Sequence, residues 1–508
     1  MSTSPDHQVQ PAQRATTARR FFPQLEGMRA VAAIAVLTTH VSFQTAAVNT
    51  GVIGPILGRL DLAVALFFGL SGFLLWRPWA GAARSSTRAD VVRPPDAALP
   101  PPDTGVPAPG AASSSDAGVP GLGAASSSDA GVPGLGAASS SDAGVPGLGA
   151  ASSSPDTGVP APPAASSSPV EVRGAARRRA SKPGETKMSA PGPSRAPRPD
   201  IGRYFRHRIV RIWPAYIVVV VLVLTLLPDA KGADLTVWLA NLTLTQVFVA
   251  LSLTAGLTQM WSLSVEVAFY LLLPLIGLVL VRLRGDRARV RIPVILAVGV
   301  LSLGWAWFAA TLPLADGVEP KNWVFGHLPW FVSGLVLAEI AATVEAAHHD
   351  PASYPGGLRI TVALSANRPL MAAVFVVAYA LACTPLAGPT GLGELTHLQF
   401  ATKMVLGAIV GYALLAPLVC ATGPFGFLDS PVMQALGRWS YGIFIWHLAV
   451  LAVVFPLFGI VPFNGNMPLV LAITVPLTIG VSAASYTFIE DPARRWLNAR
   501  EAVKGSVS

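Results

Sequence analysis

Charged residues and cysteine are both scarce in this chain of 508 residues. Asp, Glu, Lys and Arg make up only 12% of it, about half the share of an ordinary soluble protein, while 52% is hydrophobic and the mean hydropathy is +0.54. A soluble protein this apolar could not cover its surface with polar side chains, which excludes an ordinary soluble architecture. The two cysteines, Cys383 and Cys420, lie in apolar runs, which excludes a disulfide framework or a cysteine metal site.

Long apolar stretches are abundant. A helix needs about 17–25 apolar residues to span a bilayer. Stretches of this kind predict an all-α, polytopic integral membrane protein with about ten transmembrane helices. An eleventh candidate, 236–254, contains Asn241, Gln246 and four threonines, and we interpret it as interfacial or re-entrant. The ten predicted spans are 28–48, 60–80, 210–228, 262–282, 292–312, 325–345, 370–387, 401–421, 440–461 and 467–488.

The positions of basic residues indicate the orientation. If the amino terminus is cytoplasmic, the predicted outer segments carry only Arg59, Lys231 and Lys321 of the 36 Lys and Arg residues, and Lys403 lies just inside a span. This asymmetry predicts a multi-pass plasma-membrane protein with both termini in the cytoplasm. The net charge of +9 then reflects topology, so we expect the lipid bilayer and not nucleic acid as a partner. Heavy Ala and Pro usage suggests a bacterium.

A low-complexity insertion separates the second and third spans. It contains three identical 13-residue copies, at 111–123, 124–136 and 137–149. Because these copies have almost no large apolar side chains to offset the entropy of ordering, we predict a long disordered cytoplasmic insertion, with a docking segment as the alternative. The predicted organisation is a tail (1–22), the membrane core with spans one and two (23–80), the insertion (81–202), the core with spans three to ten (203–496) and a second tail (497–508).

Ionisable residues in a bilayer are costly and point to function. Arg29 and His40 in the first span are 11 residues apart, on one helical face and about 16 Å apart along the axis. Histidine changes protonation near neutral pH, which suits proton transfer to or from a hydroxyl. The alternatives are an anchoring arginine and a neutral histidine bonded to a neighbouring helix.

A basic cluster opens the third span. Arg206, Arg208 and Arg211 precede Trp213 and Pro214, and Arg208 and Arg211 share a helical face. Free backbone N–H groups at a helix start and planar guanidinium groups both favour phosphate. The cluster predicts a site for a phosphorylated cytoplasmic ligand, or alternatively an ordinary inner anchor.

Three further spans carry polar groups. Ser71 and Gly72 permit close helix approach. Glu266, which follows Trp261 by five residues, could bind an acceptor hydroxyl, orient a histidine or face a wet cavity. His447 lies between apolar residues and could be a structural partner or a base. His, Asp and Glu do not cluster at ligand spacing, so we expect no metal site.

Together these segments resemble the membrane-bound acyltransferase 3 family of integral-membrane O-acyltransferases. The resemblance covers about 23–80 and 203–496. It depends on five ordered motifs: Arg29 with ten residues before His40; Phe67-Phe68-Gly69-Leu70-Ser71-Gly72-Phe73; Arg208-Ile209-Val210-Arg211 with Trp213-Pro214; Trp261-Ser262-Leu263 with Glu266; and Ser440-Tyr441 with Trp446-His447.

The resemblance implies transfer of an acyl group, acetyl above all, from cytoplasmic acyl-CoA to a hydroxyl of a carbohydrate or glycoside. His40 would be the catalytic base or acyl carrier. Acyl-CoA would be a co-substrate, and no cofactor would be permanently bound. A passage from the arginines would lead the acyl-CoA to His40. The expected residues are His40 and Glu266 for catalysis, Arg29, Arg206, Arg208 and Arg211 for acyl-CoA, and Ser71, Trp261 and His447 for substrate.

Two other functions fit a ten-span chain. The first is a transporter or flippase for a sugar-containing substrate, with His40, Glu266 and His447 as a proton relay. Many transporters have two similar halves, and no internal repeat is visible outside the insertion. The second is a non-catalytic scaffold recruited through its basic linker.

Overall fold

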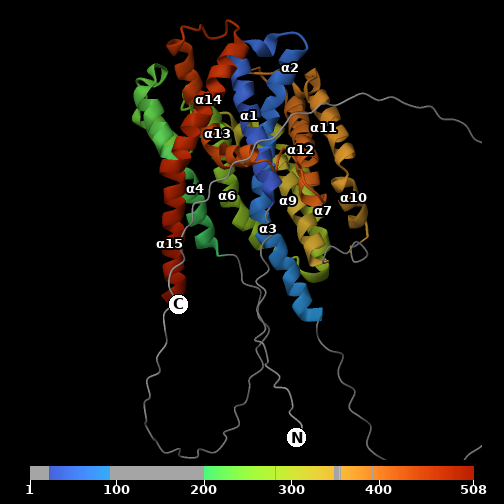
Figure 1. The fold of residues 1–508 in the computed structure, drawn as a ribbon. Helices are drawn as coiled ribbons and strands as arrows, with labels where there is room; N and C mark the ends of the chain where they lie inside the picture. Colours follow the sequence, from blue (N-terminus) through green and yellow to red (C-terminus); the bar gives the residue numbers. More distant parts are fainter. Residues whose placement is uncertain are drawn as a thin grey trace, which may run out of the picture. The chain divides into compact units, whose positions relative to one another are not determined.

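The computed structural model describes residues 22–91, 200–280, 282–347, 354, 356–391 and 393–507, all in one compact unit. Every regular element in these ranges is helical, with no strand, which confirms the all-α prediction (Figure 1). The helices are α1 (Pro23–Gln44), α2 (Ile53–Gly58), α3 (Ala63–Val91), α4 (Ile201–Leu226), α5 (Leu235–Leu242), α6 (Trp261–Leu280), α7 (Arg291–Ser302), α8 (Trp305–Ala309), α9 (Val324–Ala346), α10 (Leu358–Ala366), α11 (Arg368–Ala382), α12 (His397–Cys420), α13 (Pro431–Leu457), α14 (Met467–Ser485) and α15 (Asp491–Val507).

The predicted insertion lies outside the described residues except at its ends. There α3 continues to Val91, past the predicted boundary at 80, and α4 begins at Ile201. The prediction of disorder between them therefore stays a prediction. Of the predicted tails, 1–21 is also outside, whereas 497–507 belongs to α15.

The prediction of several membrane-spanning helices is confirmed, and the number of ten stays a prediction. Eight helical stretches in the described residues are long and apolar enough to cross a membrane, and α10 with α11 makes a ninth if this bent pair is one span. These nine correspond to nine of the ten predicted spans. The first predicted span, in α1, is not among them. Its sequence carries Glu26, Arg29 and His40, which make it less apolar than the others.

Two segments depart from straight spanning helices. Residues 236–254 form only the short α5 followed by turns, in which the Asn241 amide donates to the Ser252 carbonyl at 2.9 Å. This agrees with the prediction that they are not a full span. The predicted span 370–387 lies in α11 and the short helical turn Pro385–Ala387, and α10, which comes before it in the chain, meets α11 at 79°. Asn367 caps α11 and Pro369 follows in its first turn, so the chain restarts its helix there.

Helix α9 forms the centre of the unit and is buried along nearly its whole length. It packs against α3, α7 and α12. Its crossing with α3 is close because glycines meet there: a Cβ on Gly334 would collide with the Gly69 carbonyl, and one on Gly72 with the Phe331 carbonyl. The glycines of the Phe67–Phe73 motif therefore have the packing role that small residues have in membrane helices. Ser71 has a different role.

A second packed group brings α1 against α13, and α13 against α14. Its apolar core includes Leu37, Val41 and Ile443. Hydroxyls in α1 donate to carbonyls one turn back, as Thr38 does to Ile34 at 2.8 Å, which removes unpaired polar groups from an apolar setting. The α1–α13 contact also brings His40 and His447 together.

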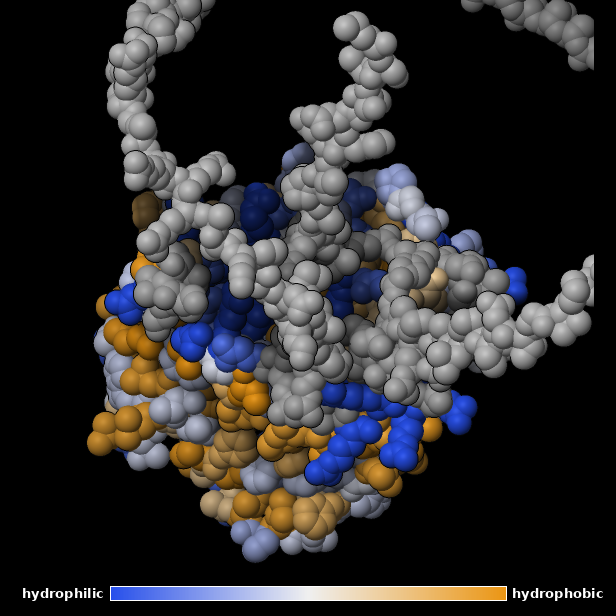
Figure 2. Space-filling model, turned by 90° about the horizontal axis from the view of Figure 1, so that it is seen from below, coloured by the Kyte–Doolittle hydropathy of each residue, from blue (hydrophilic) through white to orange (hydrophobic). Residues whose placement is uncertain are grey.

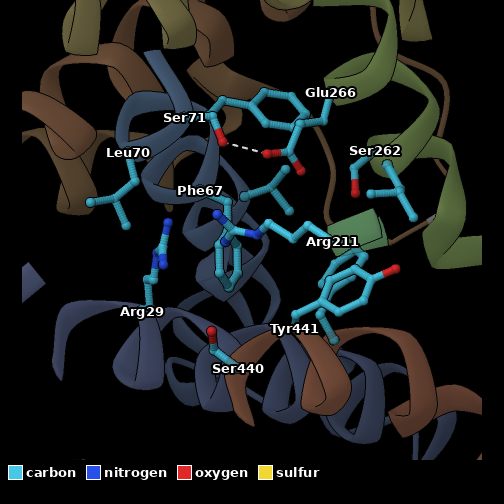
Figure 3. Close-up of a pocket in the computed structure, with 13 residues that line it drawn as sticks. Arg29, Phe67, Leu70, Ser71, Arg211, Ser262, Glu266, Ser440 and Tyr441 are labelled. Carbon is cyan, nitrogen blue, oxygen red and sulfur yellow. Dashed lines mark hydrogen bonds between the residues drawn. The ribbon is translucent and has the colours of Figure 1, made fainter. Parts of the chain in front are cut away.

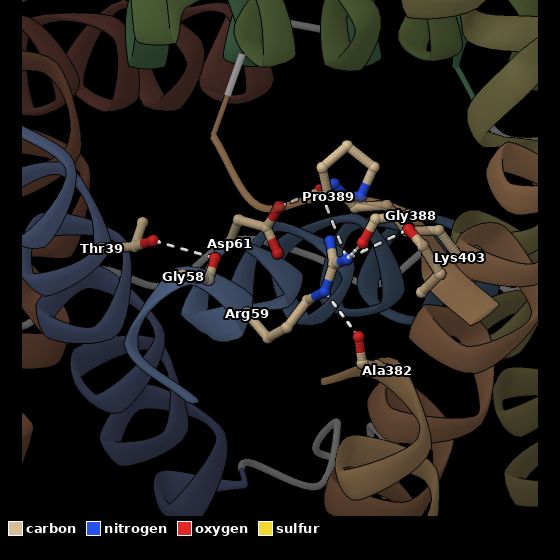
Figure 4. Close-up of polar contacts among 9 residues, drawn as sticks. Thr39, Gly58, Arg59, Asp61, Ala382, Gly388, Pro389 and Lys403 are labelled. Carbon is tan, nitrogen blue, oxygen red and sulfur yellow. Dashed lines mark hydrogen bonds and ion pairs between the residues drawn. The ribbon is translucent and has the colours of Figure 1, made fainter. Parts of the chain in front are cut away.

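One buried arginine connects distant segments (Figure 4). The Arg59 side chain, only 1% exposed, donates from Nε to the Ala382 carbonyl at 2.6 Å and from Nη2 to the Ala387 carbonyl at 3.1 Å and the Gly388 carbonyl. Nearby, the Lys403 ammonium pairs with the Asp61 carboxylate at 2.7 Å. Two of the basic residues predicted at or near the outer side, Arg59 and Lys403, are thus paired within the protein.

The carboxyl-terminal helices form one long run, visible in red in Figure 1. A π-helical segment, Tyr486–Glu490, joins α14 to α15. Pro492 lies in the first turn of α15. The extra residue per turn in the π segment changes which side chains face the bundle, and such segments are frequent at functional sites. Here the segment brings Tyr486 and Glu490 to a cavity.

Candidate functional site

A wide cavity lies among α1, α4, α13, the π-helical segment and α15. Its volume of about 420 Å³ is within the range of small-molecule sites. We call it the basic cavity because five arginines line it against two glutamates. These are Arg29, Arg208, Arg211, Arg438 and Arg494, with Glu26 and Glu490. In the view from below, blue hydrophilic side chains gather around a hollow, whereas orange hydrophobic side chains cover much of the rest (Figure 2).

Helix α4 supplies two of these arginines as the sequence predicts. Arg208 and Arg211 both line the basic cavity, while the next residue, Ile212, is buried in the core. The Arg208 guanidinium lies over the Tyr270 ring, 5.8 Å from its centroid. The Arg211 side chain makes no hydrogen bond or ion pair with a described residue and lines the basic cavity. A charged group that faces a cavity without a protein partner is available to an anionic ligand.

A smaller cavity continues from the basic cavity into the bundle. Its volume is about 50 Å³, room for a few water molecules. We call it the deep cavity. Arg29, Arg211, Ser440 and Tyr441 line both cavities, so the two adjoin. Figure 3 shows the guanidinium groups of Arg29 and Arg211 directed toward the space between them from opposite sides.

Glutamate 266 organises one wall of the deep cavity. Its Oε1 accepts a hydrogen bond from the Ser71 hydroxyl (Figure 3). It also accepts one from the Tyr270 hydroxyl at 2.5 Å. No described residue donates to Oε2. Ser71 and Glu266, 195 positions apart in the chain, thus form a direct contact across α3 and α6. The arrangement holds the carboxylate in place and leaves one oxygen for a ligand.

The two histidines of the α1–α13 contact lie against each other. Their ring centroids are 4.9 Å apart, and Nε2 of His447 is 3.2 Å from Nδ1 of His40. Nδ1 of His40 also lies 2.8 Å from the Val36 carbonyl. His447 is 1% exposed, and His40 is half-buried. His447 is therefore a neighbour of the predicted catalytic histidine.

Two phenylalanines of the deep cavity lie near this histidine pair. Phe67 and Phe444 both line the cavity, and their rings meet edge to face at 5.9 Å. The Phe444 ring is also 6.0 Å from the His447 ring. His40 does not line either of these two cavities. Neither cavity therefore reaches His40, so the two cavities do not form the whole of the expected passage from the arginines to His40.

Two other predicted site residues lie elsewhere. The exposed Arg206 pairs with Glu501 of α15 at 3.4 Å and does not line either cavity. Trp261 lies with its ring 5.1 Å from that of the buried His327 and packs against the core, while its neighbours Ser262 and Leu263 reach the deep cavity.

Several cavity residues were not predicted as site residues. Arg438, Arg494 and Glu490 line the basic cavity, and Tyr441 lines both cavities with its hydroxyl donating to the Ile212 carbonyl at 2.8 Å. Tyr441 belongs to the Ser440-Tyr441 motif that contributes to the family resemblance. The signal for Arg494 and Glu490 was weaker, because only the π-helical segment and α15 bring them to this cavity.

Comparison with protein families identifies residues 188–487 as an acyltransferase domain of the acyltransferase 3 family. This match covers more than half of the chain, so the chain belongs to that family, as predicted. It is a membrane protein of an acyltransferase family. The matched residues include α4 to α14 and leave out α1 and α3, which carry His40 and Ser71. Searches of curated proteins and of solved structures found no match.

Proposed function

We propose that the protein is a membrane O-acyltransferase that moves an acyl group from acyl-CoA to a hydroxyl of a carbohydrate or glycosylated acceptor. Family membership supports acyl transfer. The donor, the acceptor and the catalytic histidine are our proposals. The small size of the deep cavity favours acetyl among the acyl groups, because its volume is about 50 Å³.

One observation carries the proposal most directly: Arg29 and Arg211 line both the basic cavity and the deep cavity. Guanidinium groups bind phosphate with paired N–H donors. The phosphates of acyl-CoA would bind in the basic cavity, and its pantetheine arm would extend between the two arginines into the deep cavity. The same arrangement supports a plasma-membrane orientation in which the basic cavity faces the cytoplasm.

The chemistry then needs a base near the thioester. The acceptor oxygen bonds to the thioester carbonyl carbon as His40 takes the hydroxyl proton. The carbon–sulfur bond breaks, and the proton passes to the sulfur, which gives an ester and free CoA. Alternatively His40 takes the acyl group first and the acceptor hydroxyl removes it in a second step.

Glu266 would position the acceptor. Its Oε1 is occupied by Ser71 and Tyr270, and Oε2 could accept a hydrogen bond from an acceptor hydroxyl at the wall of the deep cavity. For thioester and His40 to meet, Phe67 and Phe444 must turn aside when the donor binds. A closed aromatic pair in the free protein would protect the site from water and limit thioester hydrolysis.

The test is acyl transfer by the purified protein in lipid nanodiscs. Labelled acetyl-CoA is supplied with a glycan extract of the native membranes, and both CoA release and labelled glycan are measured. We expect His40→Ala to reduce transfer about 100-fold or more, the usual contribution of a general base. His397→Ala, a half-buried histidine outside both cavities, should retain the wild-type rate.

The outcomes separate this proposal from its alternatives. Full transfer by His40→Ala would refute the histidine assignment. Absence of acetyl-CoA-dependent labelling by the wild-type protein with every extract, together with movement of a glycoside across a vesicle membrane, would favour the transporter.

A further inference from the structure

We infer that His447 is a positioning residue that fixes the tautomer of His40, so that Nε2 of His40 is the ring nitrogen that reacts. This inference depends on the proposed function of His40. It differs from the expectation that His447 binds substrate.

The first step is to find which ring nitrogen of His447 carries the hydrogen. Its Nδ1 lies 2.7 Å from the Phe444 carbonyl and 3.1 Å from the Ile443 carbonyl of its own helix. A carbonyl oxygen can only accept, so Nδ1 carries the hydrogen. In the neutral ring this leaves Nε2 as an acceptor, and Nε2 faces His40.

The second step is to find which ring nitrogen of His40 carries the hydrogen. Its Nδ1 lies 2.8 Å from the Val36 carbonyl and 3.2 Å from Nε2 of His447. Both neighbours are acceptors, so Nδ1 of His40 carries the hydrogen and is shared between them. A bare Nδ1 would instead place its lone pair against two others. For two neutral rings, therefore, the lone pair on Nε2 of His447 accepts from His40, and the lone pair on Nε2 of His40 is left for a substrate hydroxyl.

The consequence for catalysis follows from this order of hydrogen bonds. A base that is held in one tautomer presents the same nitrogen at every turnover, and the group behind it fixes which nitrogen that is. When Nε2 takes a proton, the ring becomes a cation that still donates from Nδ1 to His447 and Val36. His447 thus supports the charge without touching the substrate. Its burial, at 1% exposed, agrees with a role behind the reacting ring.

Two amide variants isolate this role. The terminal amide of His447→Gln lies near the position of Nε2, so its oxygen can still accept from His40. The shorter amide of His447→Asn lies near Nδ1, so it can bond to the Phe444 carbonyl but does not reach His40. We expect His447→Asn to lower kcat for acetyl transfer about tenfold or more with KM for acetyl-CoA unchanged, and His447→Gln to stay within about threefold of wild type.

A role in packing alone predicts a different pattern. Equal losses in both variants, or full activity in His447→Asn, would overturn the inference, and so would a rise in KM with kcat unchanged. Thermal unfolding in nanodiscs checks that both variants are folded.

A measurement on the wild-type protein covers the case in which a variant does not fold. Nitrogen-15 NMR of histidine-labelled protein in nanodiscs, with His40 assigned by comparison with His40→Ala, reports which ring nitrogen carries the hydrogen. We expect Nδ1–H for His40, and a hydrogen on Nε2 would overturn the inference. Because this result does not depend on acyl transfer, it is distinguishable from failure of the proposed function, in which wild-type protein would not transfer acetyl at all.

Discussion

Arg59 and Arg211 are both arginines of a helical membrane bundle, and they differ in burial and in the partners of their side chains. Arg59 is fully buried and donates to the carbonyls of Ala382, Ala387 and Gly388. The Arg211 side chain is half-buried, has no hydrogen-bond partner among the described residues and lines two cavities. The comparison teaches that charge in a bundle indicates a ligand site only where protein groups leave the donors free. Arg59 stabilises the fold, and Arg211 is available to a phosphate.

The largest effect is expected when Arg59, the buried arginine of this comparison, is replaced. Arg59→Met removes the donors and leaves buried carbonyls unpaired, each at a cost of about 1–3 kcal/mol. We expect the free energy of unfolding to fall by about 3–5 kcal/mol. Denaturant titration in mixed micelles measures this, with the exposed Arg206→Met as the matched control. Stability equal to the control would show that the carbonyl contacts are not what Arg59 contributes.

Replacing Arg211, the arginine that lines the cavities, should weaken the binding of acetyl-CoA and leave the fold intact. Arg211→Gln removes a charged donor from both cavities, which corresponds to about 1.5–3 kcal/mol of binding free energy. We expect KM for acetyl-CoA to rise about 10- to 100-fold, with unfolding unchanged. Initial rates at varied acetyl-CoA measure this. An unchanged KM would remove Arg211 from the donor site.

The wall of the deep cavity gives a smaller effect. Ser71→Ala leaves Oε1 of Glu266 with Tyr270 as its only donor, so the carboxylate is held less firmly. We expect acetyl transfer to fall about two- to tenfold, because one hydrogen bond is worth about 0.5–1.5 kcal/mol. Ser264→Ala on α6, which lines neither cavity, is the control, since its hydroxyl donates to the Met260 carbonyl at 3.3 Å. Equal rates for both variants would argue against the Ser71–Glu266 contact.

The smallest effect is expected for Arg206, and it tests where the site for acetyl-CoA ends along α4. Arg206 is 55% exposed at its side chain and pairs with Glu501 at the surface. Such a pair contributes about 0–1 kcal/mol. Arg206→Gln should therefore leave KM for acetyl-CoA within about twofold of wild type, in contrast to Arg211→Gln. A tenfold rise would mean that the donor site extends along α4 as the sequence analysis had predicted.

Sequence reasoning reached much of this arrangement, for physical reasons. Apolar stretches of spanning length are a strong signal, and the spacing of Arg208 and Arg211 places both on one helical face whatever the rest of the chain does. The helical period alone does not say which face of α4 meets the bundle. The sequence therefore predicts the same role for Arg206 as for Arg208 and Arg211, whereas the Arg206 side chain pairs with Glu501 of α15.

Contacts between distant segments were out of reach of the sequence. Nothing in the residues around Ser71 indicates Glu266 as its partner, and the pairing of His40 with His447 depends on how α1 packs against α13. The motif that contains Phe67 indicates close helix packing, and nothing in the sequence pairs Phe67 with Phe444. The bend between α10 and α11 was also missed, because Asn367 and Pro369 lie at the edge of an otherwise apolar stretch.

The central claim is that the arginines of the basic cavity hold acyl-CoA with its thioester directed to His40. A cryo-electron microscopy structure of the His40→Ala variant in nanodiscs with acetyl-CoA tests it most directly. The account predicts density for the phosphates beside Arg29 and Arg211, a pantetheine arm through the deep cavity, and Phe67 and Phe444 turned away from each other. Acetyl-CoA bound outside the basic cavity, or bound there with its thioester directed away from residue 40, would contradict it.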